Sequence, residues 1–185
     1  MDRPETSGAM WVFGYGSLVW NPEFPVAEMA VARLAGYVRS FCMRSIHHRG
    51  TPQDPGLVLA LDARDGAICT GLALRVQPGA EEATLAQLRE RELVSSAYVE
   101  QRLPVTLEDG RDVEAVAYVI DPDHEQYLGA LALEEQARII AHAVGGRGPN
   151  HEYLANTSSH LTELGIGDPD LDWLAGRVAQ VRRGA

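Results

Sequence analysis

One glutamate in the sequence has the surroundings that a general base needs. Residues 80–94 are rich in Ala, Glu, Leu, Gln and Arg, a composition that favours a helix. Leu85, Leu88 and Glu92 are spaced so that they share one face of this predicted helix. A carboxylate on an apolar face loses hydration, which raises its pKa toward neutrality and suits it to proton transfer. The pattern therefore makes Glu92 a candidate catalytic base.

The same spacing is compatible with a structural role for this carboxylate. Arg89 and Arg91 are close enough in sequence for Glu92 to form an ion pair at the end of the helix. Glu90 points nearly the opposite way and is expected to be a solvated surface charge. The helix pattern alone leaves the catalytic and the ion-pair interpretations of Glu92 open.

A glycine turn near the N-terminus could supply main-chain hydrogen-bond donors. Residues 10–20 are interpreted as a strand that leads into the turn Gly14-Tyr15-Gly16-Ser17. Glycine lets a ligand approach the backbone closely, and consecutive amides in such a turn can converge on an anion or a carbonyl oxygen. The turn is therefore interpreted as a small anion-binding or oxyanion-binding loop, with a tight turn of no function as the alternative.

Nucleotide binding is disfavoured at this glycine turn. The turn has neither the third glycine of a dinucleotide fingerprint nor the Gly-Lys-Ser/Thr of a phosphate loop. Pro22 and Pro25 follow it closely, so no helix is predicted directly after the turn.

A local positive cluster stands out in an otherwise acidic chain. It comprises Arg44, His47, His48 and Arg49. The arginine guanidinium is well shaped to bind a carboxylate ligand, and a solvated loop is the alternative. No His-Glu-x-x-His or Cys-x-x-Cys pattern occurs in the chain, so no metal site is predicted.

A tyrosine in the C-terminal third is a further candidate ligand contact. Tyr153 lies near the start of a predicted helix at residues 151–164, where its phenol could reach into a pocket or pack as a half-buried core residue. Asn150 precedes this helix and could cap it.

No nucleophile with a matching base is evident in the sequence. Cys42 and Cys69 lie in apolar runs and are predicted to be buried free thiols. Ser17 has no obvious partner histidine. The sequence therefore favours a site made of backbone donors and one carboxylate over a covalent mechanism.

These residues would be positioned by strands that are followed by helices. Two Asp-Gly pairs, Asp65-Gly66 and Asp109-Gly110, are predicted to form hairpin turns, and residues 145–149 are expected to form a flexible loop. Strands are expected over residues 10–20, 33–44, 57–61, 68–76, 98–107 and 113–120, and helices over 80–94, 133–144, 151–164 and 170–182. This order indicates an α+β domain built on a small, mostly antiparallel sheet or barrel.

Length and composition indicate one domain of ordinary size. The chain has 185 residues, of which 45% are hydrophobic, so residues 10–183 are assigned to a single domain and residues 1–9 to a short disordered tail. The formal charge of −10 disfavours nucleic acid as a partner. The sequence contains no signal-peptide pattern and no apolar run suited to a membrane span, which points to a cytoplasmic protein without a membrane partner.

Four motifs occur in the order found in one enzyme family. They are FGYGSLVW at residues 13–20, HRGTP at 48–52 followed by Pro55-Gly56, LREREL at 88–93 followed by Tyr98, and NHEYL at 150–154. Through these motifs, nearly the whole chain resembles the ChaC-type γ-glutamylcyclotransferases.

This resemblance implies both a fold and an activity. The fold is a small β-barrel of mixed strands with surrounding helices. The activity is cleavage of the small molecule glutathione to 5-oxoproline and cysteinylglycine, by attack of its α-amine on its γ-carbonyl, without a cofactor or metal. Glu92 matches the family's catalytic glutamate. The other implied site residues are substrate contacts: Tyr15, Gly16, Ser17, Leu18, Arg49, Tyr98 and Tyr153.

The resemblance leaves the substrate open. Ser96-Ala97 precede Tyr98 where a glycine-containing pair is common in relatives, which could alter the loop beside the base and the range of substrates. The same chemistry on another γ-glutamyl amine or dipeptide is one alternative function. A non-catalytic module that binds a γ-glutamyl ligand is the other.

Overall fold

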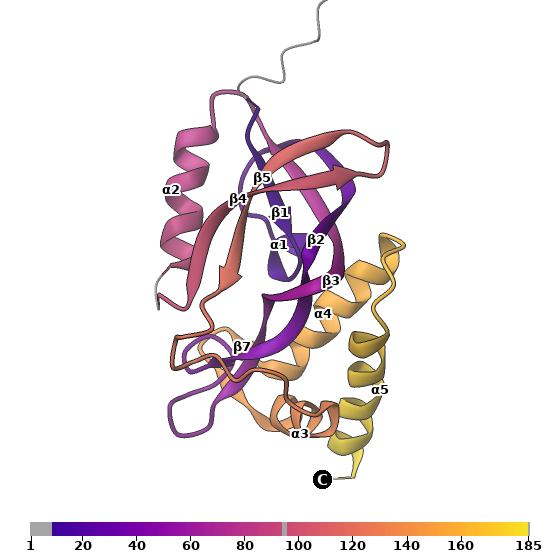
Figure 1. Ribbon diagram of the computed structural model, residues 1–185. Coiled ribbons are helices and arrows are strands. Elements are labelled where there is room, and N and C mark those ends of the chain that lie inside the picture. The colour runs from indigo at the N-terminus through magenta and orange to yellow at the C-terminus, as the bar shows by residue number, and fades with distance from the viewer. Residues whose placement is uncertain (1–8, 94–95, 185) are drawn as a thin grey trace, which may run out of the picture.

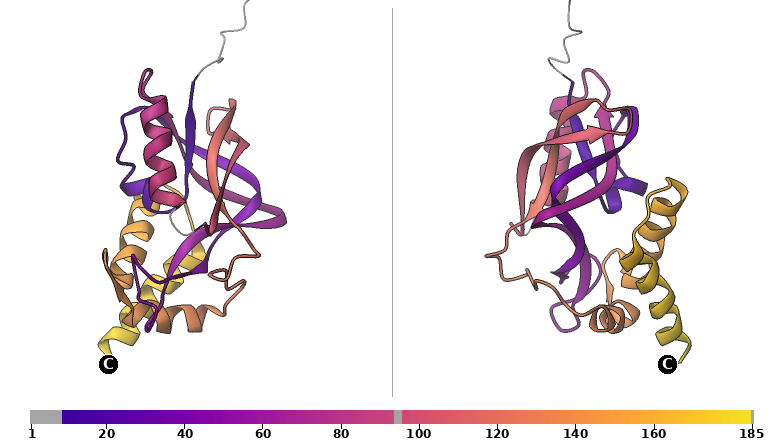
Figure 2. Two further views of the ribbon diagram at one scale, coloured as in Figure 1. Left: turned by 90° about the vertical axis from the view of Figure 1, so that its left-hand side faces the viewer. Right: turned by 45° about the vertical axis from the view of Figure 1, so that its right-hand side comes forward.

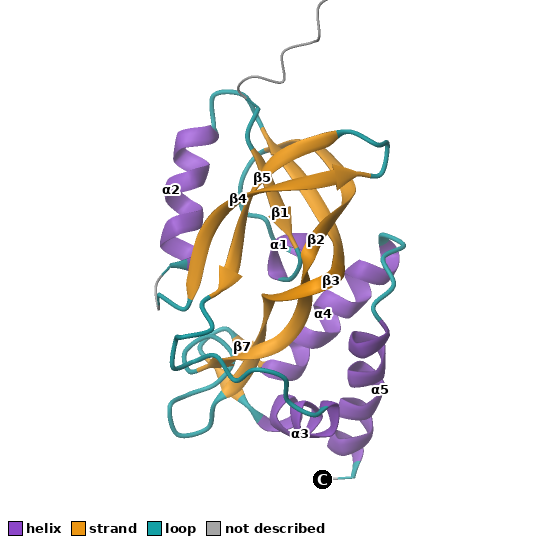
Figure 3. Cartoon of the chain, viewed as in Figure 1, coloured by secondary structure: helices purple, strands orange, loops and turns teal. Residues whose placement is uncertain are grey.

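The computed structural model describes residues 9–93 and 96–184, and at its centre is a closed barrel of five strands (Figures 1 and 3). The order around the barrel is β1-β3-β2-β4-β5. The strands are β1 (Trp11–Gly14), β2 (Val26–Ser45), β3 (Gly56–Val76), β4 (Tyr98–Leu107) and β5 (Asp112–Ile120). Most neighbours are antiparallel, whereas β5 pairs in parallel with β1 and β3. The predicted α+β fold with a small mixed barrel is confirmed.

The two longest strands, β2 and β3, pair along most of their length. The sequence predicted two shorter strands joined by a hairpin turn at Asp65-Gly66, and this prediction is wrong. Strand β3 continues through this stretch, and residues 64–67 bulge opposite Gly36 of β2. Gly36 and Gly66 have φ values of 87° and 77°, which glycine adopts without steric cost. The Asp-Gly pair therefore marks a bulge within a long strand and not a chain reversal.

Directly after β1 the chain forms a one-turn helix, α1 (Ser17–Trp20), that the sequence did not predict. The strand expected over residues 10–20 ends at Gly14. Pro22 and Pro25 lie beyond the end of this helix, where a missing N–H interrupts no helical hydrogen bond. The helix therefore forms in spite of the two prolines.

The longer helices of the described chain lie outside the barrel, and all of them were predicted within a few residues. They are α2 (Glu81–Glu92), α3 (Leu133–His142), α4 (Asn150–Glu163) and α5 (Pro169–Arg183). Helix α2 lies on one side of the barrel, and α3, α4 and α5 pack together on the other side (Figures 1 and 2). Helix α1, in the loop between β1 and β2, contacts α4, and Glu92 at the end of α2 lines the same pocket as Tyr153 of α4.

Two predicted turns have different outcomes. The hairpin at Asp109-Gly110 joins β4 to β5, as expected. Residues 145–149, expected to form a flexible loop, instead belong to a hairpin of β6 (Val144–Gly145) and β7 (Gly148–Pro149). The difference arises because this segment is fastened by hydrogen bonds to a distant loop, described below.

None of the described helices is both long and apolar enough to cross a bilayer. The tail predicted at residues 1–9 lies, except for Ala9, outside the described residues.

Candidate active site

A small cavity lies where the loop after β1, the end of α2 and the start of α4 meet the barrel. Its volume is about 40 Å³. It is lined by Tyr15, Gly16, Ser17, Leu18, Leu59, Glu92, Tyr98, Tyr118 and Tyr153. Apart from Arg49, every site residue expected from the sequence lines this inner cavity. Residues that are far apart in the chain thus converge on one small space.

A larger pocket adjoins the inner cavity. Its volume is about 310 Å³, and it shares Ser17, Glu92, Tyr98 and Tyr153 with the inner cavity. Arg49 lines this outer pocket. A ligand with a reacting end in the inner cavity would therefore place its remaining part in the outer pocket.

Glu92 is the last residue of α2, and its side chain is only 16% exposed. Leu88, one turn earlier, is fully buried, as the shared helix face predicted. Burial raises the pKa of the Glu92 carboxyl, while the positive charges of Arg91 and Arg147 act in the opposite direction. The net direction is upward, so this carboxylate is a stronger base than an exposed glutamate.

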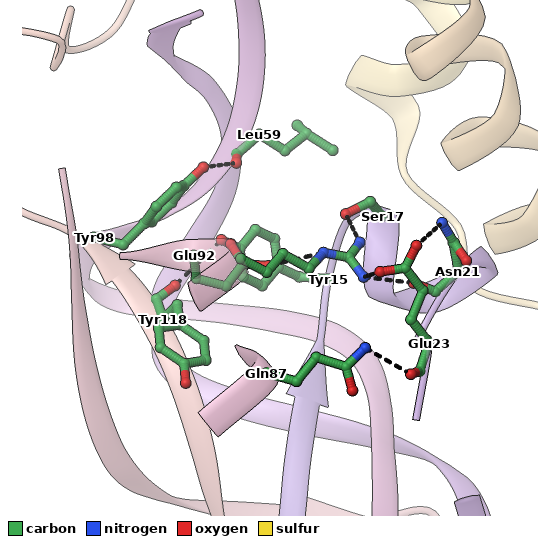
Figure 4. A network of polar contacts seen from close by, with 10 residues as sticks. Tyr15, Ser17, Asn21, Glu23, Leu59, Gln87, Glu92, Tyr98 and Tyr118 are labelled. Atoms are coloured by element: carbon green, nitrogen blue, oxygen red, sulfur yellow. Dashed lines mark hydrogen bonds and ion pairs between the residues drawn. The ribbon is translucent and has the colours of Figure 1, made fainter. Parts of the chain in front are cut away.

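The ion-pair interpretation of Glu92 holds in part. Arg91 Nε lies 3.5 Å from Glu92 Oε1. Arg89 does not take part, because its guanidinium pairs with Glu100 at 3.0 Å. Arg91 itself is mainly engaged elsewhere and donates to Ser17 Oγ at 2.7 Å (Figure 4). Glu92 is thus both directed into the site and loosely paired at the helix end.

Buried tyrosines form much of the cavity wall, and Figure 4 shows Tyr15 and Tyr98 near Glu92. The Tyr118 ring points away from Glu92 in this view, and its hydroxyl donates to Glu100 Oε1 at 2.9 Å. Tyr98 Oη donates to the carbonyl oxygen of Leu59 at 3.0 Å, and Tyr15 Oη donates to that of Tyr118 at 3.2 Å. Burial raises the pKa of the Tyr15 and Tyr98 phenols well above the ordinary value. These groups therefore remain neutral at physiological pH.

Tyr153 completes this wall from α4. Its hydroxyl oxygen accepts a hydrogen bond from Leu59 N at 3.3 Å, and its ring packs edge-on against Phe41. Burial raises its pKa to about 12. Both interpretations of Tyr153 hold, because the ring is buried in the core while the hydroxyl lines the cavity.

The glycine loop presents unused main-chain donors. Among the described residues, no hydrogen-bond acceptor is found for the amides of Gly16, Ser17 and Leu18. The carbonyl oxygens of Gly16 and Ser17 do accept, from Val19 N at 3.0 Å and from Asn21 N at 2.7 Å. The loop therefore has free donors beside the cavity, the arrangement that stabilises an anion or an oxyanion.

Close approach explains why Gly16 is a glycine. A Cβ atom at this position would lie 3.1 Å from the Tyr153 hydroxyl oxygen, closer than ordinary van der Waals contact. A side chain at residue 16 would therefore occupy space that the inner cavity needs.

Positive charge is concentrated in the outer pocket. Its basic lining consists of His47, His48, Arg49, Arg91 and Arg147. The Arg49 guanidinium is largely buried, donates to Pro149 O at 3.1 Å, and lies 5.5 Å from the centre of the Tyr153 ring. Arg44, which the sequence grouped with this cluster, is exposed and does not line the pocket. Strand alternation directs it away, so the predicted cluster is only partly correct.

The hairpin of β6 and β7 holds this basic loop in place. Gly146 N donates to His47 O at 2.7 Å, and Arg147 N donates to His48 O at 2.9 Å. A Cβ atom at Gly145 would collide with the backbone of the same loop. This packing brings Arg147 to the pocket, although sequence reasoning gave it no role. The one local signal was its position between Gly146 and Gly148, which suits a turn.

Asn150 does not cap α4 as predicted, because Pro149 occupies the N-cap position. Its buried side chain instead bonds to both backbone groups of Leu57: Leu57 N donates to Oδ1, and Nδ2 donates to Leu57 O, each at 2.8 Å. This pair of bonds fastens the first turn of α4 to β3. Tyr153, one turn later, is thereby aimed at Leu59.

Neither cysteine of the chain lines the inner cavity or the outer pocket. Cys42 and Cys69 are free and buried, as predicted, and burial raises the pKa of Cys42 to about 12. In the part of the chain that the structure describes, no group of three or more His, Cys, Asp or Glu side chains is arranged to hold a metal ion.

Comparisons with known proteins find similar sequences along nearly the whole chain. A profile of the family described as ChaC-like protein matches residues 10–183. The glutathione-specific gamma-glutamylcyclotransferase of Escherichia coli (strain K12) is 37% identical over 179 residues, which cover 97% of this chain and 76% of that protein. The human glutathione-specific gamma-glutamylcyclotransferase 1 is 36% identical over 160 residues, which cover 85% of this chain and 72% of that protein.

A solved structure has the same fold. The crystal structure of a selenomethionine-labelled γ-glutamyl cyclotransferase specific to glutathione from yeast matches with a TM-score of 0.86. The match covers 96% of this chain and 98% of the yeast chain. At 24% sequence identity, this likeness concerns the fold alone.

Proposed function

The chain belongs to the ChaC-like family, as its four motifs predicted, and on that premise we propose that it is a γ-glutamylcyclotransferase that cleaves glutathione. The products are 5-oxoproline and cysteinylglycine. The observation that carries the proposal is a buried carboxylate, Glu92, in the same small cavity as the free amides of Gly16, Ser17 and Leu18. A single base beside main-chain donors is the machinery that this ring closure needs.

The reaction moves two protons from the α-nitrogen of the substrate to the cysteine nitrogen and exchanges one amide bond for another. The α-ammonium of the substrate loses its first proton to Glu92, and the resulting amine attacks the γ-carbonyl carbon to close a five-membered ring. Glu92 returns this proton to the cysteine nitrogen as the bond from that nitrogen to the γ-carbon breaks. The regenerated carboxylate then takes the second proton from the ring nitrogen and passes it to the leaving amine, so that the products are a lactam and an ammonium group. The raised pKa of Glu92 suits proton transfer, because it makes the carboxylate a stronger base than an exposed glutamate.

The glycine loop would stabilise charge during this reaction. The amides of residues 16–18 would bind either the α-carboxylate of the substrate or the oxyanion that develops on the γ-carbonyl. Each preorganised donor of this kind contributes about 3 kcal/mol of transition-state stabilisation in well-studied enzymes. The neutral phenols of Tyr98 and Tyr153 would pack around the folded γ-glutamyl chain without competing for the proton.

The outer pocket suits the cysteinylglycine portion. Arg49 and Arg147 would attract the glycine carboxylate, which is the negative charge farthest from the reacting centre. This basic lining favours glutathione over a γ-glutamyl amine, which lacks that carboxylate. The proposal includes a cytoplasmic enzyme of one domain, residues 10–183, that uses no cofactor and has neither nucleic acid nor membrane as a partner.

The direct test is to incubate the purified protein with reduced glutathione and to quantify 5-oxoproline and cysteinylglycine. We expect both products in equal amounts. A parallel panel of γ-glutamylcysteine and a γ-glutamyl amine should show weaker turnover. Thermal stabilisation by glutathione without any product would instead identify a binding module and would contradict the proposal.

A further inference from the structure

We propose that Arg39 is a positioning residue for this reaction: by holding the Tyr15 carbonyl, its guanidinium aims the Gly16 amide into the inner cavity. Arg39 lies on β2, lines neither the inner cavity nor the outer pocket, and belongs to none of the four motifs. The inference rests on the proposed function and adds to it the element that keeps the glycine loop in its active shape.

The Arg39 guanidinium is buried and has three partners in three directions. Its side chain is 5% exposed. Nε donates to Tyr15 O at 2.6 Å, Nη2 donates to Thr70 O at 2.5 Å, and Nη1 donates to Asp168 Oδ2 at 2.9 Å. One side chain therefore ties the glycine loop to β3 and to the segment before α5.

The planar peptide bond between Tyr15 and Gly16 means that holding the Tyr15 carbonyl also fixes the direction of the Gly16 N–H. The described residues contain no cis peptide bond, so the Tyr15 carbonyl and the Gly16 N–H point in opposite directions. Because the carbonyl is drawn toward Arg39, the N–H is turned away from it. Gly16 lines the inner cavity, and its amide has no acceptor among the described residues.

The other two free amides of the loop are oriented by local contacts. The Ser17 N–H shares a peptide group with the Gly16 carbonyl, which accepts a hydrogen bond from Val19 N. The Leu18 N–H shares a peptide group with the Ser17 carbonyl, which accepts a hydrogen bond from Asn21 N. Among the described residues, Arg39 is the distant side chain that binds a carbonyl oxygen of these three peptides, whereas Arg91 contacts the loop through the Ser17 hydroxyl.

Substitution of Asp168 can distinguish this positioning role of Arg39 from a purely structural one. Its Oδ2 pairs with Arg39, and its Oδ1 accepts from Leu171 N as the N-cap of α5. Loss of the Asp168 charge would weaken a buried ion pair and destabilise the fold. The contact between Arg39 and Tyr15 O would persist, since the guanidinium keeps two carbonyl acceptors.

The experiment compares Arg39→Lys with Asp168→Asn, with kcat and KM for glutathione and the melting temperature of each variant measured. A lysine keeps the positive charge but cannot donate to three partners from a rigid plane. We expect Arg39→Lys to lower kcat/KM about 100-fold, because small misplacement of a catalytic group has effects of that size. Asp168→Asn should lower the melting temperature at least as much and keep kcat/KM within about threefold.

Arg177→Lys is the matched control, because Arg177 forms a similar multidentate pair with Glu134 on the outer helices. It should leave kcat/KM unchanged. If Arg39→Lys does not fold, Arg39→Ala is assayed with millimolar methylguanidinium, which should restore part of kcat, whereas sodium chloride at equal concentration should not.

Three results would overturn the inference. The first is an Arg39→Lys enzyme with kcat/KM within threefold of the unsubstituted protein. The second is a loss of activity that follows the melting temperature equally in the Arg39 and Asp168 variants. The third is an Arg39→Ala enzyme that methylguanidinium does not rescue. Absence of 5-oxoproline from the unsubstituted protein would instead reject the proposed function, so the two failures are distinguishable.

Discussion

The inner cavity and the outer pocket adjoin each other but have opposite character. The inner cavity is small, lined by neutral phenols, and contains one buried carboxylate, Glu92. The outer pocket is several times larger and is lined by arginines and histidines, of which Arg147 is exposed to solvent. Burial changes the chemistry of a group, whereas exposed charge is screened and mainly attracts. The proposed function therefore places the reaction in the inner cavity and substrate recognition in the outer pocket.

Loss of the carboxylate should have the largest effect. We expect Glu92→Gln to lower kcat for glutathione by about 1,000-fold, because the amide keeps the shape but cannot accept the proton. Glu90→Gln is the matched control, since Glu90 is exposed on the same helix, and it should retain full activity. Substantial 5-oxoproline release by Glu92→Gln would contradict the proposal that the reaction depends on the carboxylate of the inner cavity.

Filling the inner cavity should have the next largest effect. In Gly16→Ala, the added methyl would press on the Tyr153 hydroxyl and displace the loop amides. We expect kcat/KM to fall by about 30- to 100-fold with a modest loss of stability. Gly176→Ala adds a methyl where no atom lies within 4 Å, on α5, and should leave turnover unchanged. Equal activity of the two variants would show that residue 16 does not shape the site.

Removal of charge from the outer pocket should alter binding more than chemistry. We expect Arg147→Ala to raise KM for glutathione about fivefold with little change in kcat, because an exposed charge contributes about 1 kcal/mol. The difference from the unsubstituted enzyme should shrink at high salt. Kinetics with γ-glutamyl amine substrates should be unaffected. A lower kcat at unchanged KM would show that Arg147 contributes to the chemical step and would contradict a role of the outer pocket in substrate binding alone.

Burial of Glu92 also predicts a dependence of stability on pH. Because its folded-state pKa is raised above the ordinary 4.5, folding favours the protonated form. This stabilisation is complete below the ordinary pKa and is lost as the pH rises through the folded-state value. We therefore expect Glu92→Gln to melt at a higher temperature than the unsubstituted protein at pH 8, and the gap to close in mild acid. A difference in melting temperature that widens in acid would indicate that the pKa of Glu92 is lowered by folding instead.

The smallest effect is expected beside the base, at the departure from the family pattern. Ser96 has a φ of 60°, in the left-handed region that favours glycine. Ser96→Gly would relieve about 1 kcal/mol of backbone strain and lose part of that gain through greater freedom of the unfolded chain. We expect a net gain of about 0.5 kcal/mol in the free energy of unfolding, measured by urea denaturation. Kinetics on the γ-glutamyl panel would show whether the substrate range also changes.

Local patterns predicted the parts of the site that depend on neighbouring residues. Spacing along one helix placed Leu88 and Glu92 on an inward face, and the glycine turn after a strand became a loop of free amides. The Asp65-Gly66 prediction failed because the same pair suits a hairpin turn and a bulge, and the long partner strand selected the bulge. The cap expected from Asn150 failed because its amide found both backbone groups of Leu57.

By itself, the sequence determined the family, the fold class and the longer helices, and it singled out Glu92 and the glycine loop, because these depend on short-range periodicity and on motifs of adjacent residues. The tertiary structure alone revealed the places of Arg147 and Arg39. Arg147 enters the outer pocket through contacts with the loop of His47 and His48, and Arg39 supports the glycine loop from a pair with Asp168, 129 residues away. Contacts between residues so far apart leave no periodic signal in a single chain, so only the fold reveals them.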